Sequence, residues 1–300
     1  MDNLRGALLM VAAMAGFAIE DMFIKLTADA LPVGQIIAML GLGGGIIFAV
    51  VLRAQGKALW SSDMANLPIL LRGVGEITGT LGFVTAIALT PISSASAILQ
   101  ATPLAVTLGA ALFLREPVGW RRWSAIAVGF AGVLLIIRPG LEGFDARSLF
   151  AVLGVVGLAL RDLATRRVPP GTSSMQLSFL AFVVLVPAGI LLMIFAATPA
   201  VLPDGLQAIY LAGAVTIGVF AYYGIVAAMR VGEVSFVTPF RYSRMLFALI
   251  VGIVVFAESP DRLTLLGAAI IVASGIYTVW RERKHRRRTA ASLSKPAPAG

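Results

Sequence analysis

Ten long apolar segments, separated by short connections, set the strongest limit on what this chain can fold into. They cover residues 6–26, 33–53, 67–89, 93–113, 123–138, 148–166, 175–196, 206–228, 235–256 and 263–281. A helix needs about 20 mostly apolar residues to cross the hydrocarbon core of a bilayer. Hydrophobic residues make up 59% of the chain, against about 45–50% in soluble domains. The sequence therefore predicts an all-α polytopic membrane protein with ten transmembrane helices.

A charged motif inside these apolar segments occurs twice. Ala18–Lys25 reads AIEDMFIK, and Ala159–Arg166, in the second half of the chain, reads ALRDLATR. Glu116 and Glu258, each at the end of an apolar segment, repeat at nearly the same offset. A constant offset near half the chain length indicates a duplicated unit. We therefore expect five-helix repeats at residues 1–140 and 141–281, followed by a basic, disordered cytoplasmic tail at residues 282–300.

The distribution of Lys and Arg predicts the orientation of the chain. If the N-terminus is cytoplasmic, the connections on that side carry more basic residues than those on the other side, even without the tail. This is what the positive-inside rule requires, and it places both termini in the cytoplasm. Because each half has five spans, the second half then enters the membrane upside down. Such inverted repeats are typical of secondary transporters that bind substrate between the halves near the midplane.

Charged residues within the apolar segments are the candidate functional groups, because an unpaired charge is costly inside a membrane. The candidates away from the segment ends are Glu20, Asp21, Arg72, Glu76, Arg161, Asp162, Arg241 and Arg244. The first two are predicted in the outer half and the others in the inner half, where a surplus of two positive charges suits an anionic group. We expect Arg72–Glu76 and Arg161–Asp162 to form pairs that gate the cytoplasmic side or support the fold. For Asp21, the alternative is a structural pair with Lys25.

We expect Arg241, Tyr242 and Arg244 to contact a substrate. An arginine fork binds a carboxylate through two hydrogen bonds, and the tyrosine offers a ring face or a hydroxyl group. Gln100 corresponds to Tyr242 in the other repeat, so this face is polar in both halves. The alternative is that both arginines pair with the acidic residues of the inner half and leave nothing for a substrate.

A zwitterionic amino acid would fit this set of charges. Arg244, together with Arg241, would bind its carboxylate, and Asp21 or Glu20 would bind its ammonium group. Aromatic side chains would surround the rest of the substrate, although aromatics on membrane helices more often pack or sit at interfaces. The candidates are Phe17, Phe83, Tyr222, Tyr223, Phe236 and Phe240.

Four stretches of the chain resemble a known superfamily. They are Arg72–Gly73, AIALTPISSASAILQATPL at Ala86–Leu104, LFLREPVGWRRW at Leu112–Trp123, and AVGFAGVLLI at Ala127–Ile136. Together they resemble the drug/metabolite transporter superfamily, in particular its ten-helix EamA-type members. The resemblance implies two inverted five-helix repeats, a central cavity and movement of small metabolites across the bacterial inner membrane. Members include exporters of amino acids, nucleotide-sugar carriers and importers of compounds such as S-adenosylmethionine or riboflavin.

The sequence thus favours a secondary transporter that exports aromatic or other amphipathic amino acids by alternating access. The alternative is an importer of a cofactor-like metabolite such as S-adenosylmethionine or riboflavin. A passive channel is a third hypothesis. An intramembrane enzyme is disfavoured, since there is no HExxH motif and no cysteine, and the single histidine, His285, lies in the tail. We expect the partners to be a small-molecule substrate and the lipid bilayer, with no cofactor, metal or nucleic acid.

Overall fold

The computed structural model of the chain describes residues 2–60, 62–116, 119–140, 144–169, 171–232 and 234–293. Throughout these ranges the regular structure is helical, and ten helices or helix pairs are long and apolar enough to cross a membrane. The predicted all-α fold with ten spans is confirmed. The helices are α1 Asp2–Ala28, α2 Val33–Ala54, α3 Leu67–Leu89, α4 Ile92–Leu99, α5 Thr102–Phe113, α6 Trp120–Ile137, α7 Leu149–Thr165, α8 Ser174–Val183, α9 Leu185–Phe195, α10 Gly205–Val231, α11 Val234–Val237, α12 Ser243–Phe256 and α13 Arg262–Leu293, with short 3-10 helices η1 Ser62–Ala65, η2 Ala146–Ser148 and η3 Thr238–Tyr242.

Three of the spans are interrupted, and a proline accompanies each interruption. The fourth span breaks between α4 and α5 before Pro103, and the seventh breaks between α8 and α9 before Pro187. The ninth span begins as η3, which contains Pro239, and continues as α12. Proline lacks an amide hydrogen and clashes with the carbonyl four residues earlier, so it breaks the helix on its N-terminal side. The breaks place Gln100 between α4 and α5 and Arg241 in the 3-10 helix η3.

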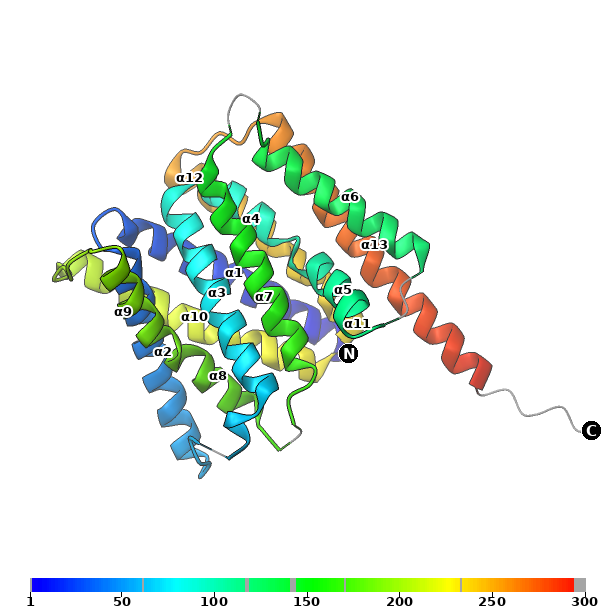
Figure 1. Cartoon of the computed structure of the whole chain (residues 1–300), viewed down its shortest axis with the longest axis horizontal. Helices are drawn as coiled ribbons and strands as arrows, with labels where there is room; N and C mark the ends of the chain where they lie inside the picture. Colours follow the sequence, from blue (N-terminus) through cyan, green and yellow to red (C-terminus); the bar gives the residue numbers. More distant parts are fainter. Residues whose placement is uncertain are drawn as a thin grey trace, which may run out of the picture.

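The packing of the spans follows a regular pattern. The most extensive contacts join α3 to α7, α1 to α10, α6 to α13, and α2 to α8 and α9, and α3 and α7 lie side by side in Figure 1, as do α6 and α13. Replacing each span by the one five places later turns the α3–α7 pair into the α10–α1 pair and leaves the other two pairings unchanged. A duplicated five-span unit would pack in this way. That the repeat is inverted, and that both termini are cytoplasmic, stay predictions.

The C-terminal segment differs from its prediction. Helix α13 continues to Leu293 and projects beyond the other helices (Figure 1), whereas disorder was expected from residue 282. The reason is local: Arg, Lys, Glu and Ala dominate residues 281–291, all are strong helix formers, and no glycine or proline interrupts them before Pro296. A long preceding helix supplies the nucleus, so adding further turns is easy. Residues 294–300 lie outside the described part of the chain.

A salt bridge joins the end of α6 to the start of α13. The Arg138 guanidinium donates to the Asp261 carboxylate, which also accepts the backbone N–H of Thr264 at 2.8 Å and caps α13. The hydrogen bond from Arg138 lowers the pKa of Asp261 to about 2.

The low pKa of Asp261 predicts a pH dependence of stability. A carboxyl group whose pKa is lower in the folded than in the unfolded chain stabilises the fold above its unfolded pKa, and this contribution is lost as the pH falls through the folded pKa. We expect the melting temperature of the wild type to fall between about pH 4 and pH 2 more steeply than that of Asp261→Asn. At pH 7 the wild type should melt at a modestly higher temperature than Asp261→Asn, because the Asp261 side chain is half exposed, and the two melting temperatures should converge toward about pH 2. Parallel pH profiles would contradict this assignment.

Candidate functional site

A cavity of about 450 Å³ lies between the two halves of the bundle, and side chains of α1, α3, α7, α10, η3 and α12 contribute to its wall. Its volume falls within the range of about 300–1,000 Å³ that is usual for small-molecule sites. The eight charged residues that the sequence singled out as candidate functional groups all line this cavity. They comprise four arginines and four carboxylates, so their formal charges cancel. The surplus of two positive charges was predicted for the six inner-half residues alone, without Glu20 and Asp21, and it stays a prediction.

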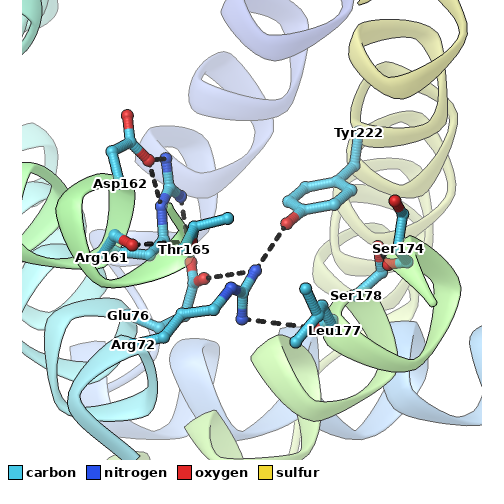
Figure 2. Close-up of polar contacts among 9 residues, drawn as sticks. All are labelled: Arg72, Glu76, Arg161, Asp162, Thr165, Ser174, Leu177, Ser178 and Tyr222. Atoms are coloured by element: carbon cyan, nitrogen blue, oxygen red, sulfur yellow. Dashed lines mark hydrogen bonds and ion pairs between the residues drawn. The ribbon is translucent and has the colours of Figure 1, made fainter. Parts of the chain in front are cut away.

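Four of these residues form one connected network, drawn in Figure 2. On α3, Arg72 Nη2 lies 3.6 Å from Glu76 Oε2, and on α7 the Arg161 guanidinium holds Asp162 Oδ1 at 2.9 Å. Arg161 Nη1 also donates to Glu76 Oε1 at 3.3 Å, which joins the two pairs across the α3–α7 contact. Both ion pairs expected from the sequence are present. Their role as a gate stays a prediction.

Two other helices attach to this network through Arg72. Its Nη1 donates to the backbone carbonyl of Leu177 on α8, and its Nη2 donates to the Tyr222 hydroxyl on α10, each at 3.1 Å (Figure 2). The Arg72 and Glu76 side chains are almost fully buried, at 4% and 8% exposure. Burial makes such groups dependent on their partners, because an unpaired charge away from water is very unfavourable. The network thus fixes α3, α7, α8 and α10 relative to one another.

A second ion pair joins α1 to α12. Arg244 Nη2 donates to both carboxylate oxygens of Asp21, at 2.9 and 2.7 Å. The guanidinium carbon lies 5.0 Å from the ring centres of both Phe17 and Phe83, a cation–π geometry. Both phenylalanines were predicted among the pocket aromatics, and both line the cavity.

This pair bears on three sequence-based expectations. Asp21 does not pair with Lys25, whose ammonium group instead donates to the carbonyls of Ile87 and Thr90 at 3.0 and 2.6 Å. Arg244 pairs with Asp21 and not with the acidic residues of α3 and α7. The separate roles predicted for Arg244 and Asp21, one binding a carboxylate and the other an ammonium group, therefore do not match an arrangement in which they bind each other.

One acid and one base of the cavity remain without a protein partner among the described residues: Glu20 and Arg241. Glu20 makes neither a hydrogen bond nor an ion pair there, and its carboxylate lies against Gly218 of α10, in space that a larger residue would fill. The Arg241 guanidinium is likewise unpaired within the described ranges, although it lies within Coulombic range of Asp162. Its backbone carbonyl accepts a hydrogen bond of 3.4 Å from Gln100 Nε2. These are the cavity charges most available to a ligand.

The two tyrosines predicted as substrate contacts are placed differently. Tyr242 lines the cavity, but its hydroxyl is buried against Gly275 of α13 and has no hydrogen-bond partner in the described part of the chain. Tyr223 is 53% exposed and does not line the cavity; its neighbour Tyr222 does. Successive residues of a helix point about 100° apart, so Tyr223 turns outward while Tyr222 faces the cavity.

Phe182 of α8 is a lining residue that the sequence reasoning missed. Its ring lies 6.0 Å from the ring of Tyr222 and 5.5 Å from that of Phe48. The signal for it was indirect: Phe182 packs against Gly44, so the glycine run at residues 43–45 makes room for a bulky side chain from another helix. The rings of Phe236 and Phe240, which were predicted to be pocket candidates, lie 5.8 Å apart in a tilted arrangement, and neither residue is part of the described lining.

Comparison with known proteins gives this arrangement its context. The sequence profile of the EamA-like transporter family matches the chain twice, at residues 4–138 and 147–280. The chain belongs to the EamA-like transporter family. The two matches together span almost all of the membrane helices, and the distance between their starting points is close to the offset of the charged motifs.

Curated relatives of this EamA-like protein carry the names of transporters of different compounds. An S-adenosylmethionine uptake transporter of Rickettsia felis is 24% identical over 72% of each chain. A riboflavin transporter of Vibrio cholerae is 32% identical over 66% of each chain. The pseudopaline exporter CntI of Pseudomonas aeruginosa is 28% identical over 90% of this chain and 94% of its own. All three relatives are named as transporters or exporters.

The fold also has a counterpart among solved structures. A protein of known crystal structure superposes with a TM-score of 0.58 at 20% identity, covering 91% of this chain and 98% of the other. This likeness concerns the fold alone. Within the described residues, no group of three or more His, Cys, Asp and Glu side chains is arranged to hold a metal ion.

Proposed function

We propose that this protein is a secondary transporter that carries a small amphipathic metabolite through the central cavity by alternating access. The family, the ten spans and a charged cavity between the helices support this proposal. The double match to the family and the exchange of packing partners between the halves support an inverted repeat. We place the protein in a bacterial inner membrane as a multi-pass protein with both termini cytoplasmic.

The observation that carries the substrate assignment is the pair of cavity charges, Glu20 and Arg241, that have no protein partner in the described part of the chain. Six of the eight cavity charges bind one another, which leaves Arg241 to bind an anionic group and Glu20 to bind a cationic one. A substrate with one cationic and one anionic group adds no net charge to a cavity whose own charges cancel. Each of its charged groups also meets an oppositely charged partner, Glu20 or Arg241. The rings of Phe17, Phe83 and Phe182 offer a surface for an apolar or aromatic part.

Amino acids with a large side chain meet this description, and export of such amino acids is one form of the proposal. S-adenosylmethionine also carries an amino-acid group and a ring system, and riboflavin carries a ring system with polar substituents. The relatives include both uptake and export proteins. Uptake of a cofactor-like metabolite therefore remains an equal alternative, and the substrate panel must include both classes.

Counterflow into liposomes that contain the purified protein tests the proposal. The labelled panel consists of Phe, Trp, Met and Thr together with S-adenosylmethionine and riboflavin. We expect saturable exchange of at least one compound, and competition by analogues that keep both charged groups. Flux that rises linearly with concentration would indicate a channel. Folded protein that exchanges no compound of the panel would overturn the amphipathic-metabolite assignment.

Arg241→Gln tests which group binds the anionic part of the substrate. A hydrogen bond to a charged group contributes about 1.5–3 kcal/mol, so we expect the KM of a carboxylate-bearing substrate to rise by about 10- to 100-fold. An analogue in which an amide replaces the carboxylate should bind wild type and variant almost equally. Arg262→Gln, at an exposed position outside the cavity, is the control. Equal KM values for Arg241→Gln and wild type would exclude this contact.

Glu20→Gln tests the other end of the substrate. We expect a higher KM for compounds with an ammonium group and little change for a des-amino analogue. The difference between the two substrates separates a direct contact from a general loss of folded protein, which would lower transport of both. If Glu20→Gln affected both compounds equally, the proposed contact with the ammonium group would be wrong.

A further inference from the structure

Two charged side chains hold the turn between α3 and α4, one at each helix end. Lys25 of α1 donates to the last carbonyls of α3, those of Ile87 and Thr90, at 3.0 and 2.6 Å. The Glu258 carboxylate accepts the first amides of α4, from Ile92 at 2.6 Å and Ser93 at 3.1 Å, as well as the Ser93 hydroxyl at 2.6 Å. The cation thus meets a helix C-terminus and the anion a helix N-terminus, the favourable sign at both ends.

These contacts cross from one half of the chain to the other. Glu258 follows α12 in the second half, whereas α4 belongs to the first half. Lys25 also lies 5.4 Å from the centre of the Phe256 ring, at the end of α12. Ser93 is fully buried beneath the carboxylate. We call Lys25 and Glu258, with the α3–α4 turn between them, the turn clamp.

The cavity ends just before it reaches the turn clamp. Its lining reaches Ile24 on α1 and Val84 on α3 but includes neither Lys25 nor the carbonyl-bearing residues Ile87 and Thr90. The lining extends in the other direction to Thr165, which is exposed and ends α7. Helices α3 and α7 run antiparallel, since Gly75 faces Arg161 and Gly82 faces Gly154. The C-terminus of α7 and the α3–α4 turn therefore lie at different ends of the bundle. The cavity is closed at the turn clamp and extends toward the end where α7 terminates.

The repeat places a matching pair at that other end. Glu116 is the counterpart of Glu258 in the first half, and Arg166 is the counterpart of Lys25 in the second half. Here the two groups bind each other, with Arg166 Nη1 donating to Glu116 Oε1 at 2.9 Å, and their side chains are 44% and 42% exposed. One acid–base set is thus engaged with helix ends and the corresponding set lies at the surface.

We propose that the turn clamp is the lock that keeps one mouth of the cavity shut, and that Glu116 and Arg166 form its counterpart, released in this structure. This inference rests on the proposed transport function. Substrate passage requires the clamp to open while the counterpart closes the opposite mouth, so the two sets exchange their engaged and released arrangements. The buried hydroxyl of Ser93 adds a third hydrogen bond that must break when the clamp opens.

Cysteine accessibility tests the lock directly, because the chain has no native cysteine and a single introduced one gives no background. Thr80 on α3 lines the cavity and serves as the reporter, as Thr80→Cys. A membrane-impermeant maleimide is added from either side of the membrane. In the otherwise unchanged protein, we expect labelling from the side where α7 ends. Adding Glu258→Gln should raise labelling from the opposite side by about fivefold, as the loss of a charge at a helix terminus predicts.

Glu116→Gln is the matched control, since it makes the same change at the repeat-related position. It should not raise labelling from the clamp side. Lys25→Gln and Ser93→Ala should act in the same direction as Glu258→Gln, and they decide the question if Glu258→Gln does not fold. If the folded clamp variants were labelled from the clamp side only as much as the protein with an unchanged clamp, the proposal that the turn clamp keeps this mouth shut would be wrong.

The labelling readout is independent of substrate identity, which separates the two proposals. Altered accessibility without exchange of any compound in the panel would leave the lock standing and remove the substrate assignment. Saturable exchange by wild type, combined with unchanged accessibility in Glu258→Gln and Lys25→Gln, would leave a transporter whose mouth is closed by other groups.

Discussion

Arg244→Gln is expected to destabilise the protein more than any other single change in the cavity. The substitution leaves the Asp21 carboxylate, whose side chain is 3% exposed, without its partner. Removing one member of a buried ion pair costs about 3–5 kcal/mol, because the remaining charge is neither solvated nor paired. We therefore expect the melting temperature of the solubilised protein to fall by roughly 6–15 °C, and transport to be lost.

The double variant Asp21→Asn/Arg244→Gln separates stability from function. Without either charge there is no uncompensated group, so most of the lost stability should return. Transport should stay well below the wild-type rate, because the cation between Phe17 and Phe83 is still missing from the cavity. Full recovery of both properties would make the pair purely structural. A single variant as stable as the wild type would show that Asp21 has another partner.

The ten spans could be predicted because they depend on local properties of the sequence. A run of about 20 apolar residues must form a helix across a bilayer, since every backbone polar group has to be satisfied within the segment. The interruptions of these spans are also local, and Pro103 and Pro187 mark two of them. The C-terminal helix shows the limit of the same reasoning: its basic composition suggested disorder, whereas its helix propensity extended α13.

The convergence of the intramembrane charges could also be predicted, but their pairing could not. Charges inside a membrane face the interior of the bundle, and all eight do so here. Arg72 and Glu76 lie one helical turn apart on α3, so their contact follows from helix geometry. The partner of Asp21 lies in the other half of the chain, and a nearer cation, Lys25, was available. Only the three-dimensional packing decides between such partners.

The sequence pattern could not decide which of two adjacent side chains on a helix faces the cavity. Tyr222 and Tyr223 have the same chemistry, and α10 is apolar around most of its circumference. The face that turns inward is determined by the contact of α10 with α1, which no periodicity in the sequence reveals. For the same reason Phe182 was missed, because its position in the lining depends on the break between α8 and α9 and on the space beside Gly44.

The contact between α3 and α7 gives the second prediction, since it depends on glycine at its closest point. A Cβ atom at Gly75 would lie 2.5 Å from the backbone nitrogen of Arg161, 2.8 Å from its Cα and 2.8 Å from the carbonyl oxygen of Gly157. All three neighbours are backbone atoms that cannot move separately, so Gly75→Ala must push α7 away from α3. Overpacking of this kind costs about 1–3 kcal/mol. The same shift would separate Arg161 from Glu76, so we expect both a lower melting temperature and loss of transport.

Gly73→Ala, slightly earlier on the same helix, is the control for this prediction. A Cβ at Gly73 would meet no atom within 4 Å, and alanine is favoured over glycine in a helix interior by about 1 kcal/mol. We therefore expect the same substitution to lower the melting temperature at position 75 and to leave it unchanged or raise it at position 73. Similar melting temperatures for the two variants would contradict the close approach of α3 and α7. That approach is what brings the Arg72–Glu76 and Arg161–Asp162 pairs into one network, so its loss would also remove the physical basis for a gate at this position.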